Sequence, residues 1–254
     1  MTQRWPQNLW IVRHGESAGN VARDVAQAAK APRIDIGLRD VEVPLSALGV
    51  QQATALGHWF GDLPIDEQPD VLLVSPYLRA RQTAEHISKA GGLEGGILDH
   101  RVDERLREKE LGLLDRLTRW GIEAEFPEQA ELRKRVGKFY HRPPCGESWC
   151  DVILRLRSAL DTISLHYSGR RVLLVGHQVV VLCLRYLLED LDEEGILEID
   201  RQADVANCGV TEYRFDPAIG PGGGLKLHRY NFTTPLAQEG ATVTAEPDAQ
   251  AAAR

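Results

Sequence analysis

The residues best suited to chemistry follow a short apolar run near the N-terminus. Leu9–Val12 leads directly into Arg13, His14 and Gly15. A short apolar run bounded by glycine indicates a buried strand, and open α/β sheets bind ligands beyond the carboxyl ends of their strands. A histidine placed there, beside a fixed positive charge, is a candidate nucleophile for an anionic substrate.

Three further segments carry complementary groups. The apolar run Val71–Val74 precedes the pattern S-P-x-x-R-A-x-Q-T-A at residues 75–84, which contains Arg79. A second run at residues 172–175 precedes a Gly-His pair that ends in His177, and residues 106–112 contain Glu108. Because the carboxyl ends of parallel strands meet at one sheet edge, we expect these side chains to gather at a single site.

This combination resembles the histidine phosphatase superfamily, also called the phosphoglycerate mutase-like family, over about Leu9 to Glu212. The resemblance implies that His14 accepts the phosphoryl group and that Glu108 is the proton donor. It also implies that the phosphoryl group is held by Arg13, Arg79 and His177, with help from Asn20. We expect further substrate contacts from the flanking residues Gly15, Ser17 and Gln178.

The chemistry of these residue types suits phosphoryl transfer. The charge of the transferred group spreads over three oxygens, and arginine offers a planar fork that matches them. His14 can attack only with one ring nitrogen unprotonated, and crowded cations favour its neutral form. The leaving oxygen needs a proton from a carboxyl group. Glu110 is the alternative to Glu108, since a strand would place both on the same face.

A basic segment, residues 133–142, bears on the substrate. Its end and the residues up to Trp149 are similar to the bisphosphatase domain that hydrolyses fructose 2,6-bisphosphate, which makes Lys138, Tyr140 and Arg142 candidate substrate contacts. Leu182 stands where that domain has an arginine, which argues against fructose 2,6-bisphosphate itself. The segment is either a solvated helix face or a cap that attracts a second anionic group.

The predicted activity is hydrolysis of a small phosphorylated metabolite, such as a sugar phosphate, through a phosphohistidine and without a metal or other cofactor. The first alternative is a phosphoglycerate mutase. Such mutases carry a Glu-Arg pair at the acid segment, whereas Lys109 follows Glu108 here. The second alternative is a non-catalytic, regulatory protein that binds a phosphate ligand, but such proteins usually lack the nucleophile or one arginine.

Apolar periodicity predicts the architecture. Three strands are expected at residues 9–12, 71–74 and 172–175, each followed by helical sequence. The clearest helices are expected at Ser46–Phe60, Arg79–Lys89, Trp149–His166 and Gln178–Glu189. Strands that alternate with helices indicate an α/β fold with a doubly wound, mainly parallel sheet and helices on both faces.

Two segments interrupt this alternation and are expected to form a small inserted cap. They cover about residues 21–43 and 118–144, and the second is expected to be largely helical. Residues 1–234 are then a single domain. Residues 235–254, rich in Ala, Gly, Glu and Gln, are expected to be a disordered tail.

Composition argues against nucleic acids and membranes as binding partners. A net charge of −7 gives no reason to expect nucleic-acid binding, and no apolar stretch suits a membrane span. The N-terminal residues lack the apolar core of a signal peptide, so we expect a cytoplasmic protein. The sequence is compatible with a homodimer but does not predict the oligomeric state. A zinc site at Cys145, Cys150 and His141 is disfavoured by the solitary C-x4-C spacing. The histidines outside the motifs are expected to be structural or solvent-facing: His58, His86, His100, His141, His166 and His228.

Overall fold

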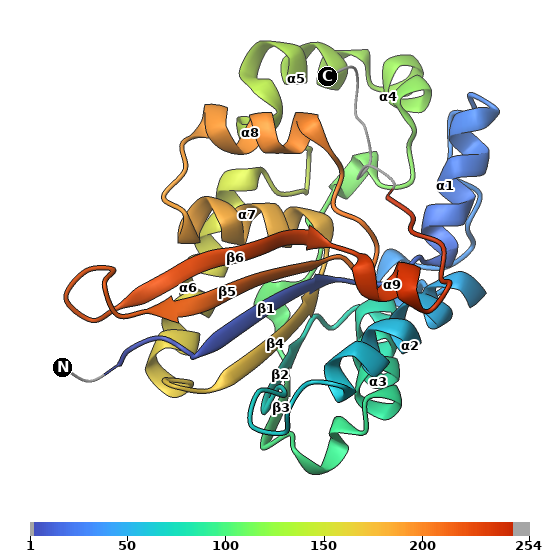
Figure 1. Cartoon of the computed structure of the whole chain (residues 1–254). Coiled ribbons are helices and arrows are strands. Elements are labelled where there is room, and N and C mark those ends of the chain that lie inside the picture. Colours follow the sequence, from blue (N-terminus) through green and yellow to red (C-terminus); the bar gives the residue numbers. More distant parts are fainter. Residues whose placement is uncertain (1–2, 246–254) are drawn as a thin grey trace.

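A mixed six-stranded sheet forms the centre of the computed structural model, which describes residues 3–245. The strand order is β3-β2-β4-β1-β5-β6 (Figure 1). The first four strands in this order are mutually parallel, and β5 and β6 are antiparallel additions at one edge. The strands are β1 (Asn8–Arg13), β2 (Val71–Val74), β3 (Asp99–Val102), β4 (Arg171–Gly176), β5 (Val210–Asp216) and β6 (Gly224–Phe232).

Helices cover both faces of the sheet (Figure 1). Side chains alternate along β1, so Leu9 and Ile11 join one buried cluster while Trp10 and Val12 join the other. The first cluster includes helices α6 (Trp149–His166), α7 (Gln178–Leu188) and α8 (Glu193–Gln202). The second includes α2 (Ala47–Gly61), α3 (Leu78–Ala90) and the short α9 (Thr234–Gln238). The predicted α/β class is therefore confirmed.

The strongly patterned elements lie where the sequence predicts them. The expected helix at residues 149–166 has those bounds, and α2 begins after its predicted N-cap Ser46, whose side chain accepts from the Gly49 amide. The sequence analysis did not identify β3, β5 or β6. Three of the four residues of β3 are exposed, and β6 is buried only at its first two residues, so neither carries the apolar run of a central strand.

The two inserted segments lie next to each other and form the cap. The first contains most of α1 (Ala18–Ala28) and the 3-10 turn η1 (Asp40–Glu42), and the second contains α4 (Arg119–Glu125) and α5 (Pro127–Tyr140). A backbone hydrogen bond joins them, from the Thr118 amide to the Pro32 carbonyl (3.0 Å), and just before the second segment the Arg116 carbonyl accepts from the Ile34 amide (2.9 Å). Three shorter 3-10 turns complete the chain: η2 (Leu93–Gly95), η3 (Glu104–Leu106) and η4 (Gly112–Leu114).

The prediction of a disordered tail is wrong for residues 235–245. Leu236 is fully buried in the cluster with α2 and α3. The Thr244 hydroxyl accepts from the side-chain amide of Gln52 (2.9 Å) and donates to that of Asn207 (3.0 Å), and both partners are fully buried. The segment is held by one buried leucine and a few hydrogen bonds, which produce no periodic apolar pattern, so its sequence does not reveal that it packs on the fold. Residues 246–254 of the predicted tail lie outside the described residues.

None of the helices between residues 3 and 245 combines the length and the apolar character that crossing a membrane would require.

We expect Thr244→Val to lower the free energy of unfolding by about 1–2 kcal/mol, because the valine removes the donor to the buried Asn207 amide oxygen and the acceptor of one of the two hydrogen bonds from the Gln52 amide nitrogen. Urea unfolding followed by circular dichroism measures the change. Val243→Ala, at an exposed position in the same segment, is the control. Equal midpoints for the two variants would show that the segment does not stabilise the fold.

Candidate active site

Three neighbouring parallel strands bring polar residues to one edge of the sheet. Backbone pairing continues one residue beyond the strands: the His14 amide donates to the Gly176 carbonyl (2.9 Å), and the Ser75 amide donates to that of Val175 (3.0 Å). His177 follows β4 directly and is the N-cap residue of α7. The sequence prediction that these segments meet at one edge is therefore confirmed for His14 and His177, whose ring centroids lie 5.1 Å apart.

The hydrogen bonds of His14 define which ring nitrogen can react. Nδ1 lies 2.7 Å from the Gly15 carbonyl oxygen, which can only accept, so Nδ1 carries the hydrogen. Nε2 accepts from Nε of Arg79 at 3.2 Å, as an unprotonated nitrogen must. The lone pair of Nε2 therefore points toward Arg79, where an anionic group would bind.

The surroundings of His14 favour its neutral form. The side chain is 3% exposed. Burial, followed by the positive charges of Arg79 and Arg13, lowers the pKa of His14 well below its ordinary value, and the hydrogen bond to Gly15 opposes this only in part. His14 is thus ready to act as a nucleophile without first losing a proton.

The loop that carries His14 is held from several sides. The Gly15 amide donates to Oγ1 of Thr83 (3.0 Å), and the Asn207 side chain donates to the His14 carbonyl (3.0 Å). The start of α2 packs directly on this loop: a β-carbon at Gly49 would lie 1.9 Å from the Glu16 carbonyl oxygen. Only glycine permits this close approach, which fixes the position of the loop.

Arg13 lies behind His14 and does not reach the pocket that His14 lines. It is 1% exposed, and its guanidinium donates to the Val205 carbonyl. The Cys208 amide in turn donates to the Arg13 carbonyl (3.0 Å). Direct contact between Arg13 and a phosphoryl group stays a prediction. In the structure, Arg13 supplies positive charge beneath the two histidines.

His177 connects Ser75 to Glu108. Its Nε2 lies 2.7 Å from the Ser75 hydroxyl, which already accepts from the Tyr77 amide. The tautomer with its hydrogen on Nδ1 lets the Ser75 hydroxyl donate to Nε2 and presents a donor to the carboxyl group on the other side of the ring. Nδ1 lies 3.6 Å from Oε2 of Glu108. Burial and the charge of Arg79 lower the pKa of His177 well below its ordinary value, so the ring is a neutral donor that faces the carboxyl group.

The structure distinguishes Glu108 from Glu110. Both side chains line the pocket, but only Glu108 lies beside His177. The Glu108 carboxylate accepts from the Lys109 amide (2.8 Å), whereas the Glu110 carboxylate turns back to the Gly112 amide (3.1 Å). The geometry therefore places Glu108, the residue selected by the sequence resemblance, nearer to the histidine pair.

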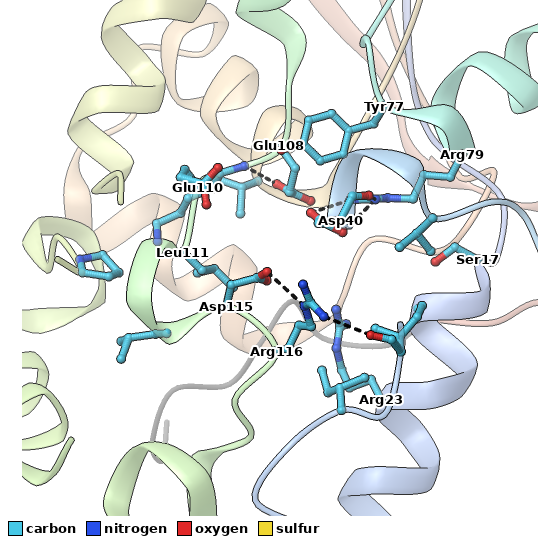
Figure 2. Close-up of a pocket in the computed structure, with 18 of the residues that line it drawn as sticks. Ser17, Arg23, Asp40, Tyr77, Arg79, Glu108, Glu110, Leu111, Asp115 and Arg116 are labelled. Carbon is cyan, nitrogen blue, oxygen red and sulfur yellow. Dashed lines mark hydrogen bonds and ion pairs between the residues drawn. The ribbon is translucent and has the colours of Figure 1, made fainter. Parts of the chain in front are cut away.

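The guanidinium of Arg79 already holds an anionic partner, Asp40 of the cap. Figure 2 shows the two side chains pointing toward each other, with Tyr77 and Glu108 beside them. Nη1 and Nη2 of Arg79 donate to the two carboxylate oxygens of Asp40 at 2.9 and 3.3 Å. Arg79 is buried and Asp40 is half-exposed. The carboxylate thus occupies the fork that a phosphate would use.

Other predicted contacts divide between the pocket and its surroundings. Ser17 and Lys138 line the pocket. The amide oxygen of Asn20 is engaged by the backbone amide and hydroxyl of Ser17, so Asn20 fixes the start of α1. Gln178 donates to Asp204 (3.1 Å) behind the pocket wall. Gly15 contributes through its backbone. Asn20, Gln178 and Gly15 thus support the site and do not line the pocket.

Tyr140 and Arg142 do not line the pocket, in contrast to the sequence prediction. Gly137 adopts a φ of 84°, which interrupts α5 and changes the direction of the following residues. Tyr140 is consequently exposed. Arg142 pairs with Asp151 at the beginning of α6, where the carboxylate caps the helix. Neither side chain contributes to the pocket in this arrangement.

Sequence reasoning missed several residues of the pocket. The Arg79 guanidinium carbon lies 4.8 Å from the centroid of the Tyr77 ring, so the two side chains stack. In the sequence, only the position of Tyr77 inside the S-P-x-x-R motif indicates this role. Asp40 carries no local signal. His141, expected to be structural or solvent-facing, lines the pocket instead. The cap also contributes a wall of apolar side chains: Ile34, Ile36, Leu38, Leu114 and Ile122.

Within residues 3–245, no group of three or more His, Cys, Asp or Glu side chains is arranged to hold a metal ion. Cys145 and Cys150 are both free thiols.

An open α/β sheet with buried histidines and an arginine at the carboxyl edge of its parallel strands is the arrangement of an enzyme that binds an anionic substrate. Residues 9–231 match the family model of the histidine phosphatase superfamily (branch 1). The chain belongs to this family, and the resemblance seen in the motifs is confirmed.

Individual relatives are similar over most of the chain. A "probable phosphoglycerate mutase GpmB" from Yersinia enterocolitica is 28% identical over 84% of this chain and 88% of its own. The structure of a mycobacterial glucosyl-3-phosphoglycerate phosphatase with VO3 is 27% identical, with a TM-score of 0.64 over 89% of this chain and 99% of the other. A putative α-ribazole-5'-P phosphatase from Escherichia coli, 19% identical, has the same fold, with a TM-score of 0.69 over 90% and 97%.

We expect the His14 ring to stay neutral through the pH range in which an ordinary histidine gains its proton, which is about pH 6.5. The folded-state pKa is lowered, so protonation needs a more acidic solution. Nitrogen NMR of ¹⁵N-histidine-labelled protein measures this, and the His14→Ala variant assigns the signal. A titration midpoint near the ordinary value would contradict the role assigned to burial.

We expect Asp40→Asn to tighten the binding of inorganic phosphate about two- to fivefold, because phosphate no longer competes with a carboxylate for Arg79. Isothermal titration calorimetry measures the affinity. Asp35→Asn changes an exposed carboxylate of the same segment and is the matched control. Unchanged or weaker phosphate binding in Asp40→Asn would show that Asp40 does not occupy the phosphate position.

Proposed function

We propose that this enzyme hydrolyses phosphomonoesters of small metabolites, such as sugar phosphates, through a phosphohistidine at His14. One observation carries the proposal: a neutral, buried imidazole turns its unprotonated Nε2 toward Arg79 while its Nδ1 is held by a backbone carbonyl. An imidazole held in this way can attack phosphorus. The chemistry needs no metal or cofactor, because arginine and histidine supply the charge and the hydrogen bonds.

In the first step, Nε2 of His14 attacks the phosphorus atom and the bond to the ester oxygen breaks. Arg79, released from Asp40, holds two oxygens of the phosphoryl group, and His177 donates to it from Nδ1. Arg13 adds positive charge from behind the histidines. The Glu108 carboxyl group donates its proton to the leaving alkoxide, which departs as the alcohol.

In the second step, a water molecule attacks the phosphorus atom of the phosphohistidine. The Glu108 carboxylate takes a proton from that water, and the nitrogen–phosphorus bond breaks. Inorganic phosphate leaves, His14 returns to its neutral form and Glu108 is protonated again. The same carboxyl group thus acts first as acid and then as base.

Phosphoglycerate mutase activity is the second candidate, and the relatives named probable phosphoglycerate mutase favour it. A mutase must return the phosphoryl group to the reoriented intermediate and exclude water. Incubation of 3-phosphoglycerate with catalytic 2,3-bisphosphoglycerate separates the two activities. Rapid isomerisation without release of phosphate would overturn the hydrolase proposal.

We expect His14→Ala to lower the hydrolysis of phosphomonoesters by at least about 10³-fold, since it removes the nucleophile. Glu108→Gln should slow the hydrolysis of a sugar phosphate by about 10²–10⁴-fold. It should slow the hydrolysis of p-nitrophenyl phosphate far less, because nitrophenolate leaves without needing a proton. Release of phosphate from a panel of substrates measures both effects. Glu110→Gln, on the same segment, is the control and should change both substrates only slightly.

Two results would contradict the assignment. Equal phosphate release by wild type and His14→Ala would exclude His14 as the nucleophile, and would leave a non-catalytic role for this site. If Glu110→Gln, and not Glu108→Gln, slowed the sugar phosphate much more than p-nitrophenyl phosphate, Glu110 would be the proton donor. Quenched wild-type enzyme should also carry phosphate on His14 that is labile in acid and stable in base.

A further inference from the structure

A second polar group lines the pocket, formed by residues that the proposed reaction does not use. It comprises His141, Arg133 and Lys109. The main charges that act on His141 are those of Arg133 and Lys109, and neither belongs to the main charges that act on His14. The pocket therefore has two polar ends, one at the histidine pair and one at this cluster.

His141 is the most unusual member of the cluster. Its side chain is 1% exposed, yet neither ring nitrogen hydrogen-bonds to any residue that the structure describes. Buried polar atoms nearly always have a partner. Burial and the two neighbouring cations lower the pKa of His141 to about 4. At neutral pH the ring is thus uncharged, and one of its nitrogens has an N–H ready to donate.

Arg133 adds a positive charge that the surrounding residues balance only in part. It is half-buried and lines the pocket, and its guanidinium makes no hydrogen bond or ion pair within the described part of the chain. Asp200, the carboxylate whose charge acts on it, already bonds the Lys138 ammonium at 2.5 Å. Burial lowers the pKa of Arg133 more than Asp200 raises it, so its charge is incompletely balanced.

Arg133 carries the positive charge at this end that is available to a ligand. Lys138, the other cation of α5 in the pocket, is already paired with Asp200. Asp200 is therefore shared between the two cations, and the charge of Arg133 is incompletely balanced. An anionic group of the ligand would balance it and would give the guanidinium and the imidazole hydrogen-bond partners that the protein does not supply.

We propose that His141, Arg133 and Lys109 form a subsite for a second anionic group of the substrate, a carboxylate or a second phosphate. The inference rests on the proposed function, because the scissile phosphate must lie at His14 for the second group to reach this cluster. Arg133 would form charge-assisted hydrogen bonds to the anion, and His141 would donate its N–H. The carbon skeleton between the two groups would lie along Trp149 and Pro143, which line the same pocket.

The test compares substrates that differ in one anionic group. In the carboxylate arm, 3-phosphoglycerate is compared with glycerol 3-phosphate. In the phosphate arm, fructose 1,6-bisphosphate is compared with fructose 6-phosphate. We expect the wild type to prefer the member with two anionic groups in at least one pair, by about tenfold or more in kcat/KM. The arm that shows the preference identifies the anion.

Arg133→Met should abolish this preference by raising KM for the substrate with two anionic groups about tenfold or more, with kcat and the hydrolysis of p-nitrophenyl phosphate unchanged. His141→Gln should act in the same direction. Arg135→Met, at an exposed position of α5, is the matched control and should keep the preference. A purely structural role would impair all substrates alike, which the KM and kcat values distinguish.

The outcomes separate this inference from the proposed function. No preference in either pair, or equal loss of both members in Arg133→Met, would overturn the subsite while phosphatase activity that depends on His14 persists. Loss of that dependence would overturn the proposed function instead. The His14→Ala variant supplies a readout without turnover: calorimetry should show that it binds the preferred compound with two anionic groups more tightly than its partner with one.

Discussion

The hydrogen bond from His14 Nδ1 to the Gly15 carbonyl is the interaction on which the site depends. It places the unprotonated Nε2 toward Arg79. Such a short-range bond is useful only if the backbone cannot move, and the structure holds that backbone at the His14 amide through Gly176 and at its carbonyl through Asn207. The sheet, the loop before β5 and the start of α2 therefore all serve the orientation of one ring.

Buried positive charge is the second constraint, because a cation in a low-dielectric site needs an anionic partner. At the histidine pair the cap provides Asp40 for Arg79. At the other end of the pocket Asp200 bonds Lys138, and Arg133 is left less completely balanced. In the proposed mode of binding, one anionic group of a ligand would replace Asp40 at Arg79 and another would add the missing charge beside Arg133.

The sequence predicts the parts of this arrangement that depend on local pattern. Apolar runs locate β1, β2 and β4, and motifs locate His14, Arg79 and His177. Features that depend on contacts distant in sequence are not predictable in this way. Asp40 is an ordinary surface carboxylate until the fold brings it to Arg79, and Thr244 gains its role from buried partners far along the chain. The position of Tyr140 depends on the positive φ of a single glycine.

Asp40 joins the cap directly to the sheet edge. The two inserted segments bond to each other, for example from Thr118 to Pro32, and the second also bonds to α8 through Lys138 and Asp200. Asp40 alone among these contacts reaches the histidine pair's arginine, since both its carboxylate and its carbonyl oxygen accept from Arg79. Under the proposed function, a phosphate that binds Arg79 would compete with both of these acceptors in the turn η1. Asp40 would then link occupancy of the site to the position of this wall of the cap.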